Sequence, residues 1–283
     1  RSILVTVGIG DGGAVSIFTN AGSMHVVADL VGYFVPDTGA RHNALAPTRL
    51  LDSRDGTGGF ATPWGAGQTR DLQVAGGGSP VPTEAEAIIA NVTMTGPSAP
   101  THLTIWPAGS SKPVASHLNA GAGQTVANLV VIPVGDGGAV SIFNNAGSAH
   151  VLLDVVGYYG ADGSTFWPVT PTRLVDSRDG TGGFSTPWGQ GQTRTLAVSG
   201  DSLVVPDHAV AVVLNVTGVF PTAATHLTVW PEGAKPVASN LNLPAGDVRA
   251  NAVIVGTDGA VELFNNSGAL HVVVGVVGFY TRP

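Results

Sequence analysis

The chain has 283 residues, enough for two domains of ordinary size, and a formal net charge of −7. Only 11% of the residues are charged, whereas 40 are glycine and 19 are proline, which favours many short strands joined by tight turns over helices. Lys112 and Lys235 are the only lysines and no basic run exists, which argues against nucleic acid as a partner, and no apolar stretch approaches the roughly 20 residues that span a bilayer. Because cysteine is absent, disulfides and thiol chemistry are excluded.

The chain begins with a partial copy of a repeat. Residues 15–18 (VSIF) and 25–29 (HVVAD) return at 140–143 and 150–154, and again at 261–264 and 271–275. We therefore expect residues 1–36 to be the C-terminal third of a module. Its unpaired strands would require sequence upstream or another source of strands, and truncation is the simpler account.

Two full copies of the repeat follow. The segment at 49–60 (RLLDSRDGTGGF) returns at 173–184, and THLTIWP at 101–107 returns as THLTVWP at 225–231. This predicts a linker at 37–46, a module at 47–159, a second linker at 160–170 and a second module at 171–283.

Short runs rich in Val, Ile and Leu predict the strands of the first full module. They cover residues 87–95, 103–106, 126–133, 139–143 and 150–158. Turn residues at 136–138 and 145–147 separate the later strands. The pattern predicts an all-β chain of tandem antiparallel β-sandwich modules, with a barrel or a prism as alternatives.

The order and spacing of these motifs resemble the repeat modules appended to secreted actinobacterial proteins, often beside cell-wall amidases and other hydrolases. PTRLLDSRDGTGG, NVT, HLTIWPAG and HVLLDVVGY carry the resemblance, which covers nearly the whole chain. It implies an extracellular or cell-surface, all-β accessory module. Binding of a polysaccharide or cell-wall glycan is inferred from the hydrolase domains beside which these modules occur. The last copy departs at Gly275, where the earlier copies have Asp29 and Asp154.

Tryptophan residues are the first candidate glycan-binding groups. Trp64 and Trp188 lie in TPWG loops, where an exposed ring would offer an apolar face to a sugar. The alternative is a ring that covers the end of the core.

A second candidate set lies on one face of a predicted strand, because side chains alternate along strands. It comprises His102, Thr104 and Trp106, and recurs as His226, Thr228 and Trp230. Its polar character predicts the less buried face. The alternative is a Trp packed beneath a loop.

The DSRDGTG turns offer carboxylates for Ca²⁺, at Asp52 and Asp55 in one module and at Asp176 and Asp179 in the other. Because the intervening Arg54 repels a cation, we favour a turn held by Arg–Asp pairs.

The recurring His25, His150 and His271 each precede an Asp or Gly by four residues. Within one strand that spacing is about 13 Å, too long for a shared metal, so structural hydrogen bonds are expected.

No catalytic motif is present, so an enzyme ranks last among the functions. The sequence favours a non-catalytic extracellular module that binds glycan, with a structural, adhesive or self-assembling surface array as the alternative.

Overall fold

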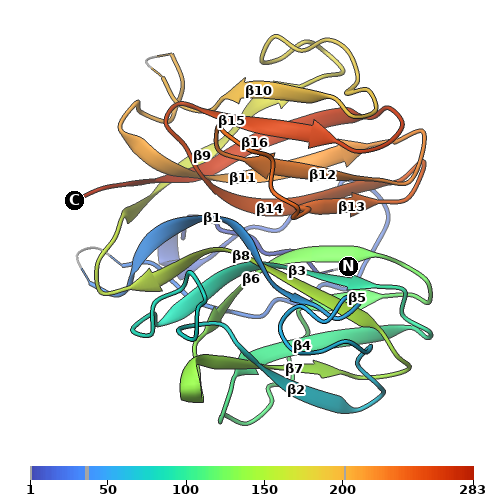
Figure 1. The fold of residues 1–283 in the computed structure, drawn as a ribbon. Helices are drawn as coiled ribbons and strands as arrows, with labels where there is room; N and C mark the ends of the chain where they lie inside the picture. The colour runs from blue at the N-terminus through green and yellow to red at the C-terminus, as the bar shows by residue number, and fades with distance from the viewer. Residues whose placement is uncertain (1, 36–37, 201) are drawn as a thin grey trace.

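The computed structural model describes residues 2–35, 38–200 and 202–283, and its strands form two successive β-sandwiches (Figure 1). The first sandwich contains β1 (Arg41–Asp52), β2 (Gln68–Gln73), β3 (Ala87–Thr95), β4 (Thr101–Pro107), β5 (Leu118–Ala120), β6 (Val126–Pro133), β7 (Ala139–Asn144) and β8 (His150–Gly160). The second contains β9 (Thr165–Asp176), β10 (Thr193–Ala197), β11 (Ala209–Val219), β12 (Thr225–Trp230), β13 (Leu241–Leu243), β14 (Val248–Gly256), β15 (Ala260–Asn265) and β16 (His271–Thr281).

Each sandwich has two four-stranded antiparallel sheets. In module one the strand orders are β1-β8-β3-β6 and β2-β7-β4-β5, and in module two they are β9-β16-β11-β14 and β10-β15-β12-β13. We call the first sheet of each pair the inner sheet and the second the outer sheet. The expected sandwich is confirmed, and equivalent strands occupy equivalent places in both modules.

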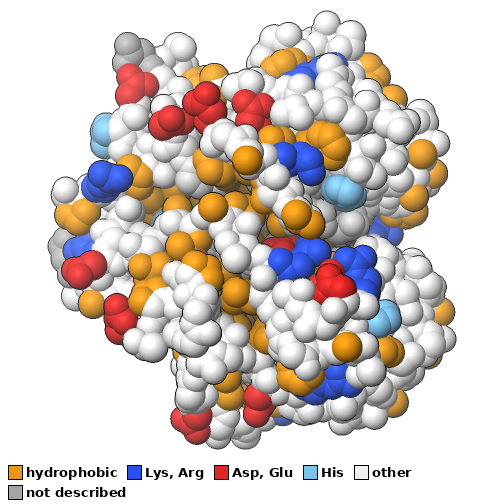
Figure 2. All heavy atoms as spheres, in the orientation of Figure 1, with side chains coloured by type: hydrophobic (Ala, Val, Ile, Leu, Met, Phe, Trp, Pro, Cys, Tyr) orange, Lys and Arg blue, Asp and Glu red, His pale blue; other side chains and the backbone are white. Residues whose placement is uncertain are grey.

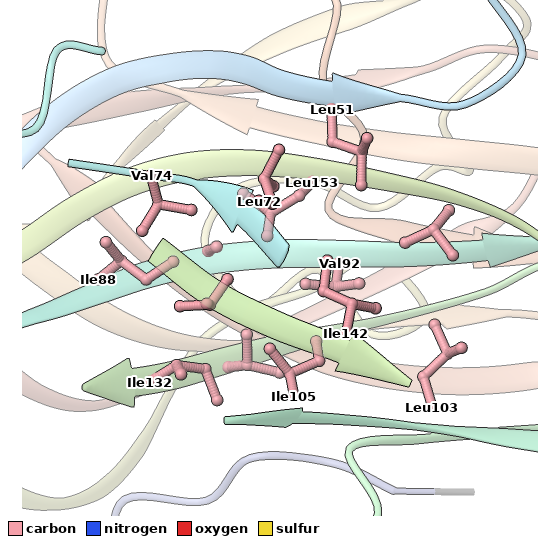
Figure 3. Close-up of a cluster of buried hydrophobic side chains, with 14 of the residues drawn as sticks. Leu51, Leu72, Val74, Ile88, Val92, Leu103, Ile105, Ile132, Ile142 and Leu153 are labelled. Carbon is pink, nitrogen blue, oxygen red and sulfur yellow. The ribbon is translucent and has the colours of Figure 1, made fainter. Parts of the chain in front are cut away.

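The core of each module lies between its two sheets, as the alternation of apolar residues predicts. Figure 3 shows Leu51, Val92 and Leu153 of the inner sheet meeting Leu72 and Ile142 of the outer sheet. All five are buried. A matching set fills module two.

The predicted linkers at 37–46 and 160–170 are wrong over most of their length, because strands occupy them. β1 begins at Arg41, and β8 continues to Gly160 before β9 starts at Thr165. Pro47 is tolerated within β1 because the register shifts between Ala44 and Thr48, where ladder hydrogen bonds are interrupted.

Residues 2–35 form no strand, although their sequence matches β6 to β8. Their one element is the short 3-10 helix η1 (Asp11–Gly13), which repeats η2 (Asp136–Gly138) of module one. In Figure 1 this segment passes behind both modules. No helix in the described part of the chain is long and apolar enough to cross a membrane.

Candidate functional site

The loop tryptophans are core residues, which corrects the expectation that they face outward. Trp64 and Trp188 are 0% exposed. The indole Nε1 of Trp64 donates to the carbonyl of Ile142 at 2.9 Å, and that of Trp188 to the carbonyl of Leu263 at 3.1 Å. Neither ring is accessible to a sugar.

An arginine covers the outer side of each of these rings. The guanidinium carbon of Arg70 lies 4.4 Å from the Trp64 ring centroid, and that of Arg194 lies 4.3 Å from the Trp188 ring. Arg70 also donates to the carbonyl oxygens of Thr62 and Pro63, so it ties the TPWG loop to β2. The TPWG motif therefore closes one end of the sandwich.

The second candidate set lies on one face of the outer sheet, as predicted, but a loop covers most of it. Thr104 donates to the carbonyl of Ala115, and Trp106 Nε1 donates to the carbonyl of Ser110 at 3.0 Å. Trp106 is only 7% exposed. Thr228 and Trp230 make matching bonds to Ala238 and Gly233. The prediction of an open face was wrong because residues 108–117 fold back over the sheet.

The two histidines of this set remain half-buried at the surface. His102 lies 6.3 Å from the Phe143 ring and His226 lies 6.3 Å from the Phe264 ring. The ammonium groups of Lys112 and Lys235 lie 4.5 and 4.6 Å from the same two rings. Burial and the nearby lysine lower the pKa of each histidine. Among the predicted glycan-binding residues, only His102 and His226 are not buried.

The DSRDGTG turn is held by ion pairs. Asp52 is buried and accepts hydrogen bonds from the backbone N–H, Nε and Nη2 of Arg54, and from Nη1 of Arg49. The hydrogen bonds from Arg54 lower the pKa of Asp52 to about 2, against the opposing effect of burial.

The second module repeats this turn. Arg178 and Arg173 bind Asp176 and hold its pKa well below the ordinary range. Asp55 and Asp179 accept the backbone N–H of Thr57 and Thr181. The expected arginine pairs therefore hold Asp52 and Asp176, whereas Asp55 and Asp179 are engaged by backbone N–H groups of their own turns. Nowhere in the described residues do three or more His, Asp or Glu side chains gather as a metal site.

One ion-pair network differs between the modules. Arg49 of β1 also binds Asp154 of β8 through two bonds of 2.8 and 3.0 Å, whereas Arg173 faces Gly275 and keeps only Asp176. The Arg173 side chain is consequently 52% exposed and the Arg49 side chain only 18%. Burial raises the pKa of Asp154, although Arg49 opposes the shift.

The expected structural hydrogen bonds are present for His150 and His271, two of the three recurring histidines. Ser53 Oγ lies 3.0 Å from Nδ1 of His150, and Ser177 Oγ lies 3.0 Å from Nδ1 of His271. Both serines are buried, and each also accepts a backbone N–H of the neighbouring strand. These serines were not predicted from the sequence, although their recurrence at equivalent positions of the two turns was a signal for them.

The two modules are in extensive contact, which the sequence pattern did not predict. The two inner sheets pack against each other through a third apolar cluster, which includes Ile89, Leu129, Val213, Ile254 and Tyr280. Polar contacts cross the same interface, because Asn251 Nδ2 donates to Asn91 Oδ1 and the backbone N–H of Leu129 donates to Asn251 Oδ1.

Residues 2–35 use the same interface against module one. Leu4 aligns with Leu129, and Asn128 aligns with Asn251. The backbone N–H of Leu4 donates to Asn128 Oδ1 at 3.2 Å, as that of Leu129 donates to Asn251 Oδ1 at 3.3 Å. The partial copy therefore packs on module one as module one packs on module two.

Stacked aromatic side chains join module one to module two, and module two to the partial copy. His42 of β1 stacks on Tyr280 of module two, with centroids 4.0 Å apart and an interplanar angle of 24°. Phe166 occupies the position of His42 in module two, and it stacks on Phe34 at 4.3 Å and 29°. Because the partial copy contacts module two as module two contacts module one, the three copies surround a pseudo-three-fold axis.

These features define the chain as a tandem β-sandwich repeat protein. No protein-family model matches it, and a search of curated proteins finds no match. Similar solved structures include the tandem CBM22 domain of Paenibacillus barcinonensis Xyn10C, at 9% identity over 85% of this chain and 99% of that chain, with a TM-score of 0.23. The f-lectin of Morone saxatilis serum is 13% identical over 87% and 96%, also with a TM-score of 0.23, and the STIV MCP is 10% identical over 87% and 98%, with a TM-score of 0.21. TM-scores this low support no conclusion about the function of the chain.

Proposed function

We propose that the chain is a non-catalytic, extracellular structural element, which holds neighbouring domains or surfaces at a fixed separation. The observation that carries this proposal is the interface between the inner sheets, where apolar side chains and hydrogen bonds join the modules. Two β-sandwiches joined only by a flexible linker would bend relative to each other. A buried, hydrogen-bonded interface instead makes one stiff body.

Surface features agree with a structural role. Figure 2 shows hydrophobic side chains gathered near the seam between the modules, a group of basic and acidic side chains at the seam, and further charged groups scattered over the outer faces. The carboxylates of the DSRDGTG turns are engaged by arginine or by backbone N–H groups, and the half-buried His150 is engaged by the buried Ser53. An extracellular setting rests on the resemblance to secreted modules.

Distance measurements on a doubly labelled chain test the stiffness. Thr69 and Thr193 are equivalent exposed residues of β2 and β10, on the two outer sheets. Because the chain contains no cysteine, Thr69→Cys with Thr193→Cys gives two unique sites for dyes. We expect a single narrow distance distribution in single-molecule energy transfer.

A charge placed in the interface provides the matched comparison. Ala211 of β11 is buried in the intermodule cluster, and Ala211→Glu should broaden the distance distribution and increase the mean distance. Thr195→Glu on the exposed outer face should leave it unchanged. A broad distribution in the unmodified chain would refute the rigid-body proposal.

We propose glycan binding as a second candidate function, at the clusters of Phe143 with His102 and Lys112 and of Phe264 with His226 and Lys235. The observation that favours it is the recurrence of the same half-buried aromatic ring, imidazole and ammonium group in both modules. Aromatic rings beside hydrogen-bonding groups suit sugars. Two linked weak sites would gain roughly 10²–10⁴ in apparent affinity.

Titration of a panel of soluble polysaccharides and cell-wall glycan fragments, followed by calorimetry, tests this candidate. If a glycan binds, Phe143→Ala with Phe264→Ala should abolish binding, and Thr57→Ala with Thr181→Ala in the exposed DSRDGTG turns should not. Binding that survives loss of both phenylalanines would place the glycan elsewhere, and no response across the panel would eliminate the candidate.

A further inference from the structure

Residues 2–35 expose the side chains that fill a core in module one. Val5 and Val7 align with Val130 and Ile132 of β6, which are both 2% exposed, yet Val5 is 66% and Val7 56% exposed. Ile17 and Leu30 align with the buried Ile142 and Val155, and both are largely exposed. The exposed face is thus the inside of a sandwich that lacks its other strands in the described residues.

The backbone of residues 2–35 likewise lacks, in the described part of the chain, the neighbouring strands that its counterpart has in module one. In module one β8 lies between β1 and β3, and β7 lies between β2 and β4. The matching residues 25–35 and 14–19 have no strand partner on either side in the described part of the chain. The turn that precedes residues 14–19 is nevertheless formed, because Gly10 N–H donates to the Ala14 carbonyl at 2.9 Å, as Gly135 does to Ala139 between β6 and β7.

A carboxylate indicates the charge of the missing partner. Asp29 aligns with Asp154, which is buried and binds Arg49 of β1 through two bonds. No ion pair to Asp29 is formed among the described residues. A strand that pairs with residues 25–35 in the register of β1 would bring an arginine to Asp29.

The pseudo-three-fold arrangement fixes where these strands would lie. Leu4 and Phe34 already occupy the places that Leu129 and Tyr159 take in module one. The segment is therefore anchored to both modules, with its unpaired face turned away from them. Only the β1–β5 part of a third module is needed to complete the ring.

We propose that residues 2–35 are a docking surface for the β1–β5 part of a module of this same repeat, with an arginine at the position of Arg49. Docking would convert the segment into the β6–β8 part of a third sandwich and close the pseudo-three-fold ring. This inference goes beyond the proposed function, which concerns the two complete modules, and it does not depend on glycan binding.

The test adds a polypeptide with the sequence of residues 41–125 to an isotope-labelled full chain. The expected result is a one-to-one complex, in which amide exchange at residues 25–34 slows at least tenfold. Asp29→Asn should weaken this complex at least tenfold, whereas Asp11→Asn, a matched change in the exposed η1 turn, should not. Faster exchange within β3 of the labelled chain would mean that the probe displaces module one instead, and would overturn the proposal.

A second arm removes the risk that the free probe aggregates. Residues 41–125 are joined directly ahead of residue 1, which restores the spacing found between β5 and β6. Protected amides at residues 25–34 in this longer chain, lost again when the added copy of Val92 becomes Asp, support the proposal. Unprotected amides at these residues in both arms overturn it.

Discussion

The hydroxyl groups of Tyr159 and Tyr280 lie 2.7 Å apart in the buried interface between the modules, although the two tyrosines are the same position of successive copies. Contact between equivalent residues follows when both lie close to a pseudo-symmetry axis. Each hydroxyl has the other as its partner, and burial raises the pKa of Tyr159 to about 12 and that of Tyr280 well above its ordinary value.

Substitutions of these two tyrosines should have strongly non-additive effects on the free energy of unfolding. Tyr159→Phe or Tyr280→Phe leaves one buried hydroxyl unpaired, which should cost about 1–3 kcal/mol in the free energy of unfolding. The double variant has no unpaired hydroxyl and should be no less stable than either single variant. Urea denaturation of the four proteins measures the coupling, and simple addition of the two losses would contradict the paired geometry.

His42 predicts an acid-sensitive interface. Its imidazole is buried with neither nitrogen hydrogen-bonded, and burial lowers its pKa from 6.5 to about 3. Below pH 6.5 the unfolded chain therefore binds a proton at His42, whereas the folded protein does not bind this proton until the pH approaches about 3. Stability should fall as pH decreases from 6.5 to about 3, by at most about 1.4 kcal/mol per pH unit from this residue.

His42→Phe is the natural variant for this test, because module two already has Phe166 at the equivalent position. The variant should be more stable than the unmodified chain at pH 7, by about 1–3 kcal/mol, since no buried nitrogen is left unpaired. Its advantage should grow toward pH 4. Parallel stability curves for the two proteins between pH 7 and pH 4 would show that His42 is not the titrating group.

The sequence predicted the strands better than it predicted their surroundings. The expected bounds of β3 and β6 are those observed, because each is a continuous apolar run between turn signals. Period-two alternation also placed His102, Thr104 and Trp106 on one face of the sheet correctly. It could not show that residues 108–117 cover that face, because this loop is fixed by tertiary hydrogen bonds to Ala115 and Ser110.

The intermodule contacts were hidden for a related reason. Ile89 and Val213 lie in strands that are apolar on both faces, and such a strand does not say which face meets its own module and which meets another. Recurrence of Tyr at 159 and 280 was the available signal. The ion-paired turns were predictable because Arg49, Asp52 and Arg54 are close in sequence.

The tryptophan environments give a direct optical prediction. Trp167 is 51% exposed, whereas Trp64, Trp106, Trp188 and Trp230 are buried. Iodide should therefore quench only the emission of Trp167, and the emission that remains in Trp167→Phe should be almost insensitive to iodide. Strong quenching in that variant would mean that one of the four buried rings reaches solvent, and would reopen the tryptophans as sugar platforms.

Module two has Gly275 where module one has Asp154, and a carboxylate introduced at this position should stabilise module two. A Cβ built there meets the Thr172 carbonyl at 3.5 Å, an ordinary contact, so Gly275→Asp fits and brings a carboxylate to Arg173. Gly275→Ala isolates the backbone contribution, which is about 0.5–1 kcal/mol. The free energy of unfolding of the aspartate variant should exceed that of the alanine variant by roughly 1 kcal/mol, because a half-exposed ion pair contributes little more.

In module one, Asp154→Ala should lower the free energy of unfolding by more than this amount, since it leaves the largely buried Arg49 with Asp52 alone. Amide exchange resolved by module assigns each change, and an alanine variant as stable as the aspartate variant would show that Arg173 gains nothing from the pair.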